Sequence, residues 1–368
     1  MKRRGRILLR LAALLLILPS AALPEGAWYT FTESDVPERL AFLVDDADYS
    51  GTVTMTFLGD CTLGGEESSR GSAIGFFRRV EDNGTDFPMR YLSALTRTDD
   101  ITVANLEGVL TDRKLTKVDK EYNFSGPTSY TEILTGAEIE CVTLANNHSH
   151  DYGNPGYADT KDALKTAGVA YFGTDCVAVW DNGEGLRIGF TGVSFSISGN
   201  RAKALARQTD LLKKLGCAAI VTVMHAGQEY VYKPNGTQRA IADRAIADGA
   251  DLIVGHHPHV VQGYEIRKGV PVIYSLGNCS FGGTTHAKDS DATVLRAELR
   301  FENGKLAETV LRFFPISITS DRQYNNYSPA FLTGADAVRV LDKLRDSTGN
   351  GFGPFDEQGG AAVVCPAE

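Results

Sequence analysis

Three of the seven histidines in this chain lie within four positions, at His256, His257 and His259. They follow the apolar run 252–254, and Pro258 separates the last two of them. A strand that ends in His-Pro-His holds two imidazoles on one rigid turn beyond the carboxyl edge of a sheet. Neutral imidazole nitrogens on a fixed backbone are common ligands of transition metals. The motif therefore predicts a metal site rather than a solvated histidine-rich turn.

Four other strand-like runs, 52–58, 101–104, 142–145 and 221–224, also end in side chains that carry oxygen or nitrogen. These side chains are Asp60, Asn105, Glu107, Asn146, Asn147, His148, Asp151, His225 and Glu229. Open α/β sheets bind ligands at the carboxyl ends of their strands, so we expect these groups to meet at one edge. Two carboxylates, an amide and three or four imidazoles suit Mn, Fe or Zn better than Ca. The set exceeds what one tetrahedral ion needs, so we expect one or two divalent transition-metal ions.

Together these segments resemble the bacterial poly-γ-glutamate capsule-synthesis family called CapA, which is related in fold to the calcineurin-like metallophosphoesterases. The matching motifs are Gly59-Asp60, Asn105-Leu-Glu107, Asn146-Asn-His-x-x-Asp-x-Gly153, His225-x-Gly-x-Glu-Tyr230, Gly255-His-His-Pro-His-Val260 and Tyr274-Ser-Leu-Gly-Asn278. The resemblance covers about residues 51–316. It implies an α/β fold, an α+β sandwich of layered β-sheets flanked by helices.

The resemblance also implies a role for each candidate residue. The expected metal ligands are Asp60, Glu107, Asn147, His225, His257 and His259. His148 is the expected catalytic residue, which protonates or stabilises a leaving group. Asp151, Glu229 and Asn278 are expected to orient these residues from a second layer. His256 stands where relatives usually carry glycine, and Thr62 stands where metallophosphoesterases carry a histidine, so one firm and one weak metal site is an open alternative.

The function implied by the resemblance is that of an exported, metal-dependent hydrolase-like protein of capsule, poly-γ-glutamate or cell-envelope polymer biosynthesis. Its expected partners are an anionic polymer or small phosphoester substrate and a membrane-bound polymer synthase. Two alternatives stay open. The protein is either a non-catalytic accessory or binding component of polymer synthesis or export, or an extracytoplasmic phosphoesterase that acts on nucleotides.

The elements that must position these residues alternate along the chain. Further strand-like runs lie at 140–144, 187–193, 218–223 and 270–274, and helical patterns at 87–95, 129–135, 156–167, 203–215 and 238–248. Helices between apolar strands indicate crossover connections and a largely buried sheet. Runs 293–301 and 307–316 flank the turn 302–305 and predict a hairpin.

Outside residues 51–317, which we expect to form the main domain, the chain has three other segments. Residues 1–22 combine a basic start with an aliphatic run and small residues, which indicates a secretory signal peptide or a membrane anchor. Residues 23–50 are expected to be a tether. Residues 318–368 are expected to be a C-terminal extension with one helix, 335–344, and a mobile tail from Gly349. We therefore expect an extracytoplasmic protein, secreted or anchored to the outer face of the cytoplasmic membrane.

The charge and cysteine content further narrow the classes of partner and metal site that we expect. The net charge is −9, and removal of the five basic residues in segment 1–22 would take it to −14. A surface that acidic repels phosphate backbones, which argues against a nucleic-acid partner. The six cysteines are scattered and have no Cys-x-x-Cys pair, so we expect mostly free thiols and no zinc–thiolate site.

Overall fold

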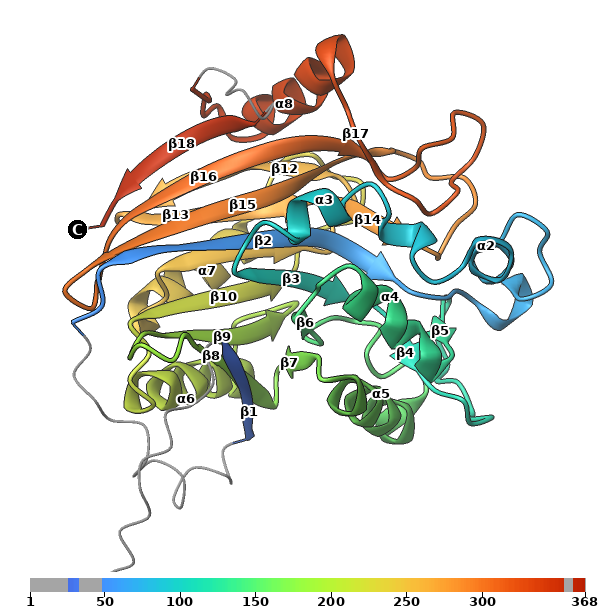
Figure 1. Ribbon diagram of the computed structural model, residues 1–368, viewed down its shortest axis with the longest axis horizontal. Helices are drawn as coiled ribbons and strands as arrows, with labels where there is room; N and C mark the ends of the chain where they lie inside the picture. The colour runs from blue at the N-terminus through green and yellow to red at the C-terminus, as the bar shows by residue number, and fades with distance from the viewer. Residues whose placement is uncertain (1–25, 33–47, 354–359, 368) are drawn as a thin grey trace, which may run out of the picture.

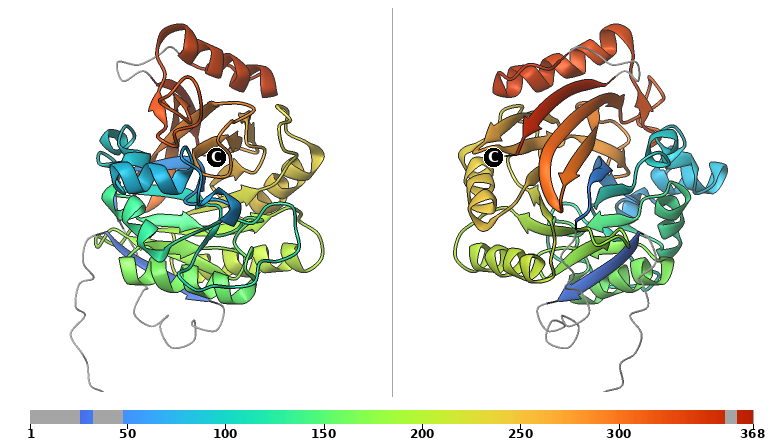
Figure 2. Two further views of the ribbon diagram at one scale, coloured as in Figure 1. Left: turned by 90° about the vertical axis from the view of Figure 1, so that its right-hand side faces the viewer. Right: turned by 60° about the vertical axis from the view of Figure 1, so that its left-hand side comes forward.

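Two β-sheets pack face to face at the centre of the molecule, and helices cover their outer faces (Figures 1 and 2). The computed structural model describes residues 26–32, 48–353 and 360–367. This layered α/β arrangement confirms the fold class that the sequence predicted.

The first sheet has seven strands, of which four run parallel. Its order is β1 (Ala27–Thr32), β8 (Cys176–Asp181), β9 (Arg187–Ser194), β10 (Ala219–His225), β11 (Leu252–His256), β13 (Val270–Leu276) and β12 (Val261–Arg267). Strands β9, β10, β11 and β13 are the parallel group. Helices α6 (Asn200–Lys214) and α7 (Gly236–Asp248) pack against the outer face of this group and supply its crossovers.

The second sheet has nine strands and a second parallel group. Its main order is β17 (Ala330–Phe331), β16 (Lys305–Ser317), β15 (Asp291–Glu302), β2 (Gly51–Thr62), β3 (Ile101–Leu106), β6 (Cys141–Thr143) and β7 (Ala170–Phe172). Off this path, β14 (Asn278–Phe281) pairs with β2, and β18 (Ala361–Pro366) pairs with β16. Strands β2, β3, β6 and β7 are parallel, and β15 and β16 form the expected hairpin.

Shorter elements surround the second sheet. The helices are α2 (Phe76–Asn83), α3 (Ser93–Thr96), α4 (Thr131–Gly136), α5 (Gly153–Ala167) and α8 (Gly334–Thr348). Three 3-10 turns lie at Glu67–Ser69, Phe87–Met89 and Thr128–Tyr130, and the strands β4 (Val109–Leu110) and β5 (Ser125–Gly126) form a small separate sheet. Helix α8 packs mainly on β12, which places the C-terminal extension on the main core.

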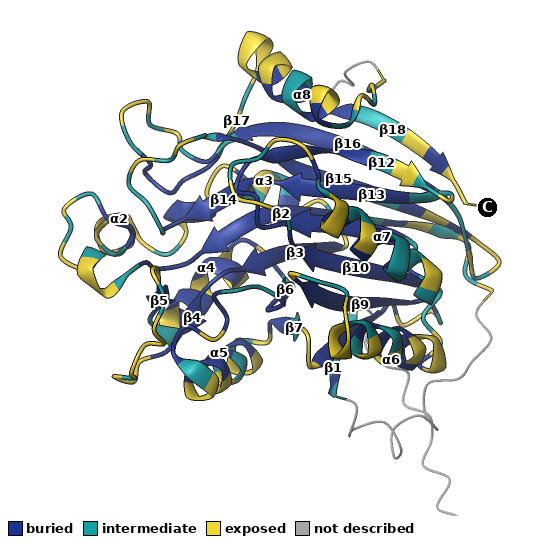
Figure 3. Cartoon of the chain, turned by 180° about the vertical axis from the view of Figure 1, so that it is seen from behind, coloured by how far each residue is buried: buried dark blue, intermediate teal, exposed yellow. Residues whose placement is uncertain are grey.

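The main hydrophobic core fills the space between the two sheets. It contains apolar side chains from both, among them Phe57, Phe190, Phe301 and Phe313, each less than 2 % exposed. Burying an aromatic ring of this size stabilises the fold by about 1.5–3 kcal/mol. Figure 3 shows the strands buried over most of their length and the helices exposed on their outer sides. The sandwich is therefore a rigid support for the loops at its edges.

Two edge strands differ from the expectations. Strand β1 lies in the segment expected to be a tether and pairs antiparallel with β8, with Trp28 opposite Trp180. Strand β18 lies in the tail expected to be mobile and pairs antiparallel with β16. Each is a short segment whose stability comes from a partner strand distant in sequence, which a local pattern does not reveal.

One expected helix is also broken. The pattern at 87–95 forms the turn Phe87–Met89 and the separate helix α3 instead of a continuous helix. Phe87, Met89 and Leu92 are all buried, because two short turns bury these side chains as effectively as one helix does. The helix expected at 335–344 is α8, and the six cysteines are free thiols as expected.

Segment 1–22, expected to be a signal peptide or membrane anchor, lies outside the described residues. Among the residues that the structure does describe, no helix is long and apolar enough to span a bilayer.

The fold predicts a pH-dependent stability that originates at Glu140, just before β6. Burial raises the pKa of Glu140 to about 7, against an opposing hydrogen bond that Thr102 N–H donates to its carboxylate. Because the folded protein holds this proton more tightly than the unfolded chain, stability should fall as the pH rises from about 4.5 to about 7 and then level off. The variant Glu140→Gln should reduce that fall, measured as the urea midpoint against pH. An unchanged slope would contradict the assignment.

Candidate metal centre

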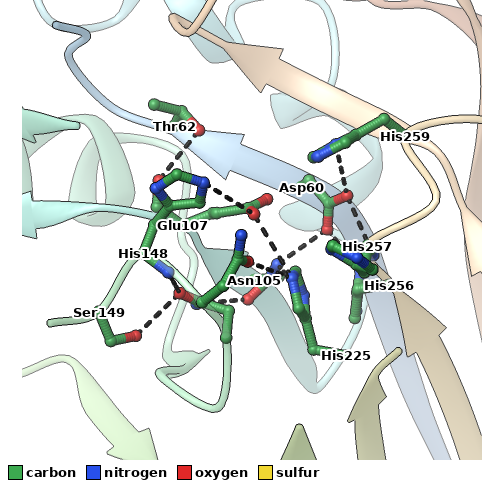
Figure 4. Close-up of polar contacts among 12 residues, drawn as sticks. Asp60, Thr62, Asn105, Glu107, His148, Ser149, His225, His256, His257 and His259 are labelled. Atoms are coloured by element: carbon green, nitrogen blue, oxygen red, sulfur yellow. Dashed lines mark hydrogen bonds and ion pairs between the residues drawn. The ribbon is translucent and has the colours of Figure 1, made fainter. Parts of the chain in front are cut away.

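The parallel strands of both sheets end at one common edge, and the candidate ligands gather there. Asp60 lies near the end of β2, Glu107 follows β3, and Asn147 lies in the loop after β6, all in the second sheet. The first sheet contributes His225, the last residue of β10, and the histidines that follow β11. Figure 4 shows the side chains of Asp60, Glu107, His225, His257 and His259 directed toward one another from the two sheets. Every residue expected to be a metal ligand is at this edge.

The centre of the cluster is Glu107. Its side chain is fully buried, and neither carboxylate oxygen has a hydrogen-bond partner among the described residues. Its Oε1 lies 3.4 Å from His225 Nε2 and 4.0 Å from His148 Nε2. Burial, reinforced by the negative charge of Asp60, raises the pKa of Glu107 well above its usual value. A buried carboxylate without partners is unstable as an anion unless a cation lies against it.

Two groups of potential ligand atoms share this carboxylate. Atoms of Glu107, His257 and His259 lie within 4.8 Å of one another, and so do atoms of Asp60, Glu107 and His225. Spacing of this kind allows each group to close around one cation, with Glu107 between them. The side chains therefore fit one or two divalent ions, as the sequence predicted.

Asp60, in contrast to Glu107, is surrounded by donors. Asn105 Nδ2 donates to its Oδ1 at 2.8 Å, and the backbone N–H of His257 donates to its Oδ2 at 3.3 Å. Nδ1 of His256 and Nδ1 of His259 each lie 3.2 Å from a carboxylate oxygen. Burial alone would raise the pKa of Asp60, but the imidazoles outweigh it and hold that pKa well below its usual range.

His225 and Asn147 meet across the two sheets. Nε2 of His225 lies 2.7 Å from Oδ1 of Asn147, and Nδ1 of His225 lies 3.3 Å from Nδ2 of Asn105. Burial lowers the pKa of His225 well below its usual value. The imidazole is therefore neutral, which is the form that binds metals.

The turn after β11 is strained and holds its two imidazoles in place. His257 has φ 97° and His259 has φ 56°, both in the left-handed region that side chains disfavour at a cost of about 1–3 kcal/mol each. Nδ1 of His259 lies 2.8 Å from Oδ1 of Asn278, which orients the ring. Burial lowers the pKa of His259, but Glu107 and Asp60 outweigh it and raise that pKa to about 10. The two carboxylates thus hold a proton on His259 and attract positive charge to the site.

Glycine lets the two sheets approach each other at this point. A Cβ on Gly59 would lie 2.2 Å from the carbonyl oxygen of Gly277, so only glycine fits there. The close contact lets Asp60 N–H donate to Gly277 O at 3.0 Å and places Asp60 in register with Asn278. The chain leaves β13 of the first sheet and joins β14 of the second at Gly277.

His148 stands at one side of the cluster with a buried carboxylate behind it. Its Nδ1 lies 2.8 Å from Asp151 Oδ2, which leaves Nε2 facing Glu107. Asp151 is fully buried and also accepts the backbone N–H of Phe124. Burial lowers the pKa of His148 and outweighs the opposing effect of Asp151. This geometry leaves Nε2 free to take up a proton and to release it again, with Asp151 stabilising the protonated ring through Nδ1.

Lys120 is a neighbour of His148 that the sequence pattern did not single out. Its Nζ lies 2.5 Å from Asp151 Oδ1 and 3.0 Å from His148 Nδ1, and it donates to the carbonyl oxygen of Asn147 at 2.9 Å. The side chain is 28 % exposed, so its positive charge faces the rim of the site. Lys120 comes from the irregular loop between β4 and β5, and no motif marks it.

Asn105 and His256, which the sequence placed at this edge without a role as metal ligands, are almost completely buried beside Asp60. Oδ1 of Asn105 accepts from Asn146 Nδ2 at 2.9 Å, so Asn105 links Asp60 to the loop after β6. His256 has Nδ1 beside Asp60 and orients that carboxylate.

Three residues that the sequence raised as candidates or neighbours of the site have other contacts than the metal-ligand cluster. Glu229 is exposed, and no hydrogen bond to it is found among the described residues, so it influences Glu107 and His257 only through its charge. The hydroxyl of Thr62 donates to the carbonyl oxygen of Glu107 at 2.9 Å, where it braces the backbone. His150 is exposed and packs on Tyr157, with ring centroids 4.2 Å apart.

Aromatic rings stand around the imidazoles. Phe124 lies 4.3 Å from His148, Phe281 lies 5.1 Å from His259, and Phe195 lies 5.4 Å from His257, measured between ring centroids. Phe195 is 38 % exposed and has φ 62°. Such walls limit the access of water and strengthen the electrostatic interactions inside the site.

Comparison with known proteins gives concordant matches. The model of the family described as "Bacterial capsule synthesis protein PGA_cap" matches residues 54–282. The capsule biosynthesis protein CapA of Bacillus anthracis is 30% identical over 93% of this chain and 83% of its own length. The PGA biosynthesis protein CapA of Bacillus subtilis is 34% identical over 57% of this chain and 61% of its own length. A Mycobacterium tuberculosis protein named "Probable polyglutamine synthesis accessory protein" is 28% identical over 49% of this chain and 55% of its own length.

The contrast between two buried carboxylates predicts opposite effects of removing their charge. In chelator-treated protein, at pH values above the raised pKa of Glu107, Glu107→Gln should raise the free energy of unfolding by about 1–3 kcal/mol, because there the folded protein would otherwise hold an ionised carboxylate without hydrogen-bond partners. Asp60→Asn should lower it by a similar amount, because it removes an acceptor that donors surround. Urea unfolding of both variants measures these free energies. Destabilisation by Glu107→Gln would contradict the inference that the Glu107 carboxylate is stable only beside a bound cation.

Proposed function

The chain belongs to the bacterial capsule synthesis protein family, and on that premise we propose that it is an exported, metal-dependent hydrolase of capsule or polyglutamate biosynthesis. The observation that carries the proposal is the fully buried carboxylate of Glu107, shared by two groups of ligand atoms and bonded to neither. Structural carboxylates are normally paired, so a carboxylate held this way supports a role in binding a cation.

The metal would be held by residues from both sheets. Atoms of Asp60 and His225 form one group with Glu107, atoms of His257 and His259 form the other, and Asn147 lies beside His225. The mixed oxygen and imidazole set suits Mn, Fe or Zn. When bound, such an ion supplies Lewis acidity to the bond under attack and helps to provide a nucleophile near neutral pH.

The residues around the metal would transfer the proton and orient the ligands. His148 would transfer a proton at Nε2 to the leaving group, since that atom faces the centre of the site. Asp151 fixes the ring through Nδ1, and Lys120 holds Asp151 in place. Asn278 and His256 orient His259 and Asp60, respectively.

The substrate that we propose is anionic, either the polymer itself or a small phosphoester. A cation at the site and the partly exposed ammonium of Lys120 would both attract negative charge in an otherwise acidic protein. A membrane-bound polymer synthase as partner, and export directed by residues 1–22, complete the proposal. The basic and aliphatic pattern of that segment supports export.

A second candidate function is a non-catalytic accessory component of polymer synthesis. Thr62 favours it, because its hydroxyl braces a backbone carbonyl where related phosphoesterases place a ligand histidine. The printed name of the mycobacterial relative contains the words "accessory protein". An accessory protein would bind metal or polymer without turnover. A phosphoesterase that acts on nucleotides is the third candidate, and Tyr230, whose ring centroid lies 6.2 Å from that of His259, is a candidate for base stacking.

Metal content tests the proposal first. Residues 23–368, purified after incubation with Mn, Fe or Zn, should retain about one or two equivalents by inductively coupled plasma mass spectrometry. The double variant Asn147→Ala/His257→Ala should retain almost none. His286→Ala, a change at an exposed histidine outside the cluster, should behave as the parent protein does. Absence of metal from the parent protein would leave only the accessory function.

Turnover separates the hydrolase from the accessory protein. Hydrolysis of phosphoesters or γ-glutamyl oligomers should stop on chelation and return with metal. His148→Asn should lower kcat by roughly 10²–10⁴ while the metal content stays unchanged, because it removes only the proton donor. Turnover that survives chelation would exclude the proposed mechanism, and metal binding without any turnover would establish the accessory function.

A further inference from the structure

A cavity lies between the two sheets at the edge opposite to the metal centre. Its volume is about 390 Å³, and it is lined in part by Asp100 and Glu140, which directly precede β3 and β6. The metal-centre residues follow the other ends of these same strands, so the length of the sheet separates the two sites (Figure 1). Nothing in the proposed hydrolase mechanism uses this cavity.

Aromatic side chains form one part of its wall. Trp28 and Trp180, the only two tryptophans of the chain, are direct neighbours across β1 and β8, and Tyr49 joins them in the lining. Trp180 is only 7 % exposed, and no hydrogen bond from its indole N–H is found among the described residues. A Cβ on Gly26 would lie 3.7 Å from that nitrogen, which places it near another lining residue. An indole N–H with no partner on the protein can donate to an oxygen acceptor of a molecule in the cavity.

Carboxylates form the other part. Asp100, Glu140 and Glu184 line the cavity, and none of them forms an ion pair within the described part of the chain. The backbone N–H of Thr54 donates to Asp100 and that of Thr102 donates to Glu140, both at 2.8 Å, which fixes the two groups. The lining residues include no Lys, Arg or His. Burial raises the pKa of Glu140 to about 7, as expected where no cation offsets the loss of water.

We propose that this cavity binds a small organic cation, an ammonium group that carries a hydroxyl or similar oxygen nearby. The carboxylates supply the negative charge, and the faces of Trp28, Tyr49 and Trp180 attract an ammonium group by cation–π interaction. The oxygen of the ligand would accept the free indole N–H of Trp180. The aromatic wall favours an alkylated ammonium over a hydrated metal ion, which needs oxygen ligands on all sides.

Tryptophan fluorescence is a direct test, because both tryptophans of the chain line this cavity. Choline serves as the probe, and 3,3-dimethylbutan-1-ol is its uncharged isostere with the same shape. Choline should change the fluorescence saturably and bind at least about tenfold more tightly than the isostere. The full chain from residue 23 is used, with the metal centre loaded and with it chelated, and the response should be the same in both.

Variants test whether choline binding depends on the carboxylates of the cavity. Glu184→Gln and Asp100→Asn should each weaken choline binding about two- to fivefold, and the double variant should weaken it further. Glu184→Asp keeps the charge and should retain most of the affinity. Glu67→Gln removes a similar exposed charge outside the cavity and should have no effect. Calorimetric titration repeats the measurement without relying on a fluorophore.

Four results would overturn the proposal. Equal binding of choline and its isostere would show that the cavity recognises shape and not charge. A saturable response to glucose that exceeds that to choline would identify a saccharide pocket. A response that Mg²⁺ or NaCl reproduces, or the absence of any response to choline, would show that no organic cation is recognised. None of these outcomes depends on whether the protein hydrolyses a polymer.

Discussion

The buried carboxyl group of Glu107, whose ionised form has no hydrogen-bond partner among the described residues, is the constraint around which the rest of the site is arranged. A carboxylate with neither oxygen bonded is costly in a protein interior, and here it stands beside a second buried carboxylate, Asp60. The neighbouring side chains reduce that cost only partly, since the donors are directed at Asp60. The imidazoles of His225 and His257 face Glu107 as neutral or weakly basic groups. A cation is the component that would complete this arrangement, and the two groups of ligand atoms that share Glu107 suit it.

Neither sheet could build this site alone. The second sheet supplies both carboxylates and Asn147, and the first supplies the ligand imidazoles. The two halves are joined where the chain passes from β13 to β14 at Gly277, directly against Gly59. That contact fixes Asp60 beside Asn278, and Asn278 in turn orients His259. The glycines in these motifs therefore set the distance between the sheets, while the polar residues beside them set the orientation of the ligands.

Thr62 and Lys120 support the candidate site without offering a carboxylate or an imidazole. Thr62 braces the backbone of Glu107, while Glu107, His257 and His259 form one of the two groups of potential ligand atoms. Lys120 brings a positive charge to His148 and Asp151 from a loop that lies outside the recognised motifs. The opposite edge of the same sandwich also carries carboxylates, together with two tryptophans and without Lys, Arg or His in its lining.

The sequence by itself determined the layered α/β fold, the edge at which the ligands gather and the family. Strand-end positions of polar residues such as Asp60 and His225 depend on local patterns of apolar runs, and these are readable along the chain. Tertiary structure alone decided which residues touch. Lys120 joins the site, Asn105 and His256 pack against Asp60, and Glu229 stays exposed, because contacts between distant segments are not encoded in any local spacing. For the same reason the sequence did not predict β1 and β18. A short edge strand forms only when a distant partner strand provides its hydrogen bonds.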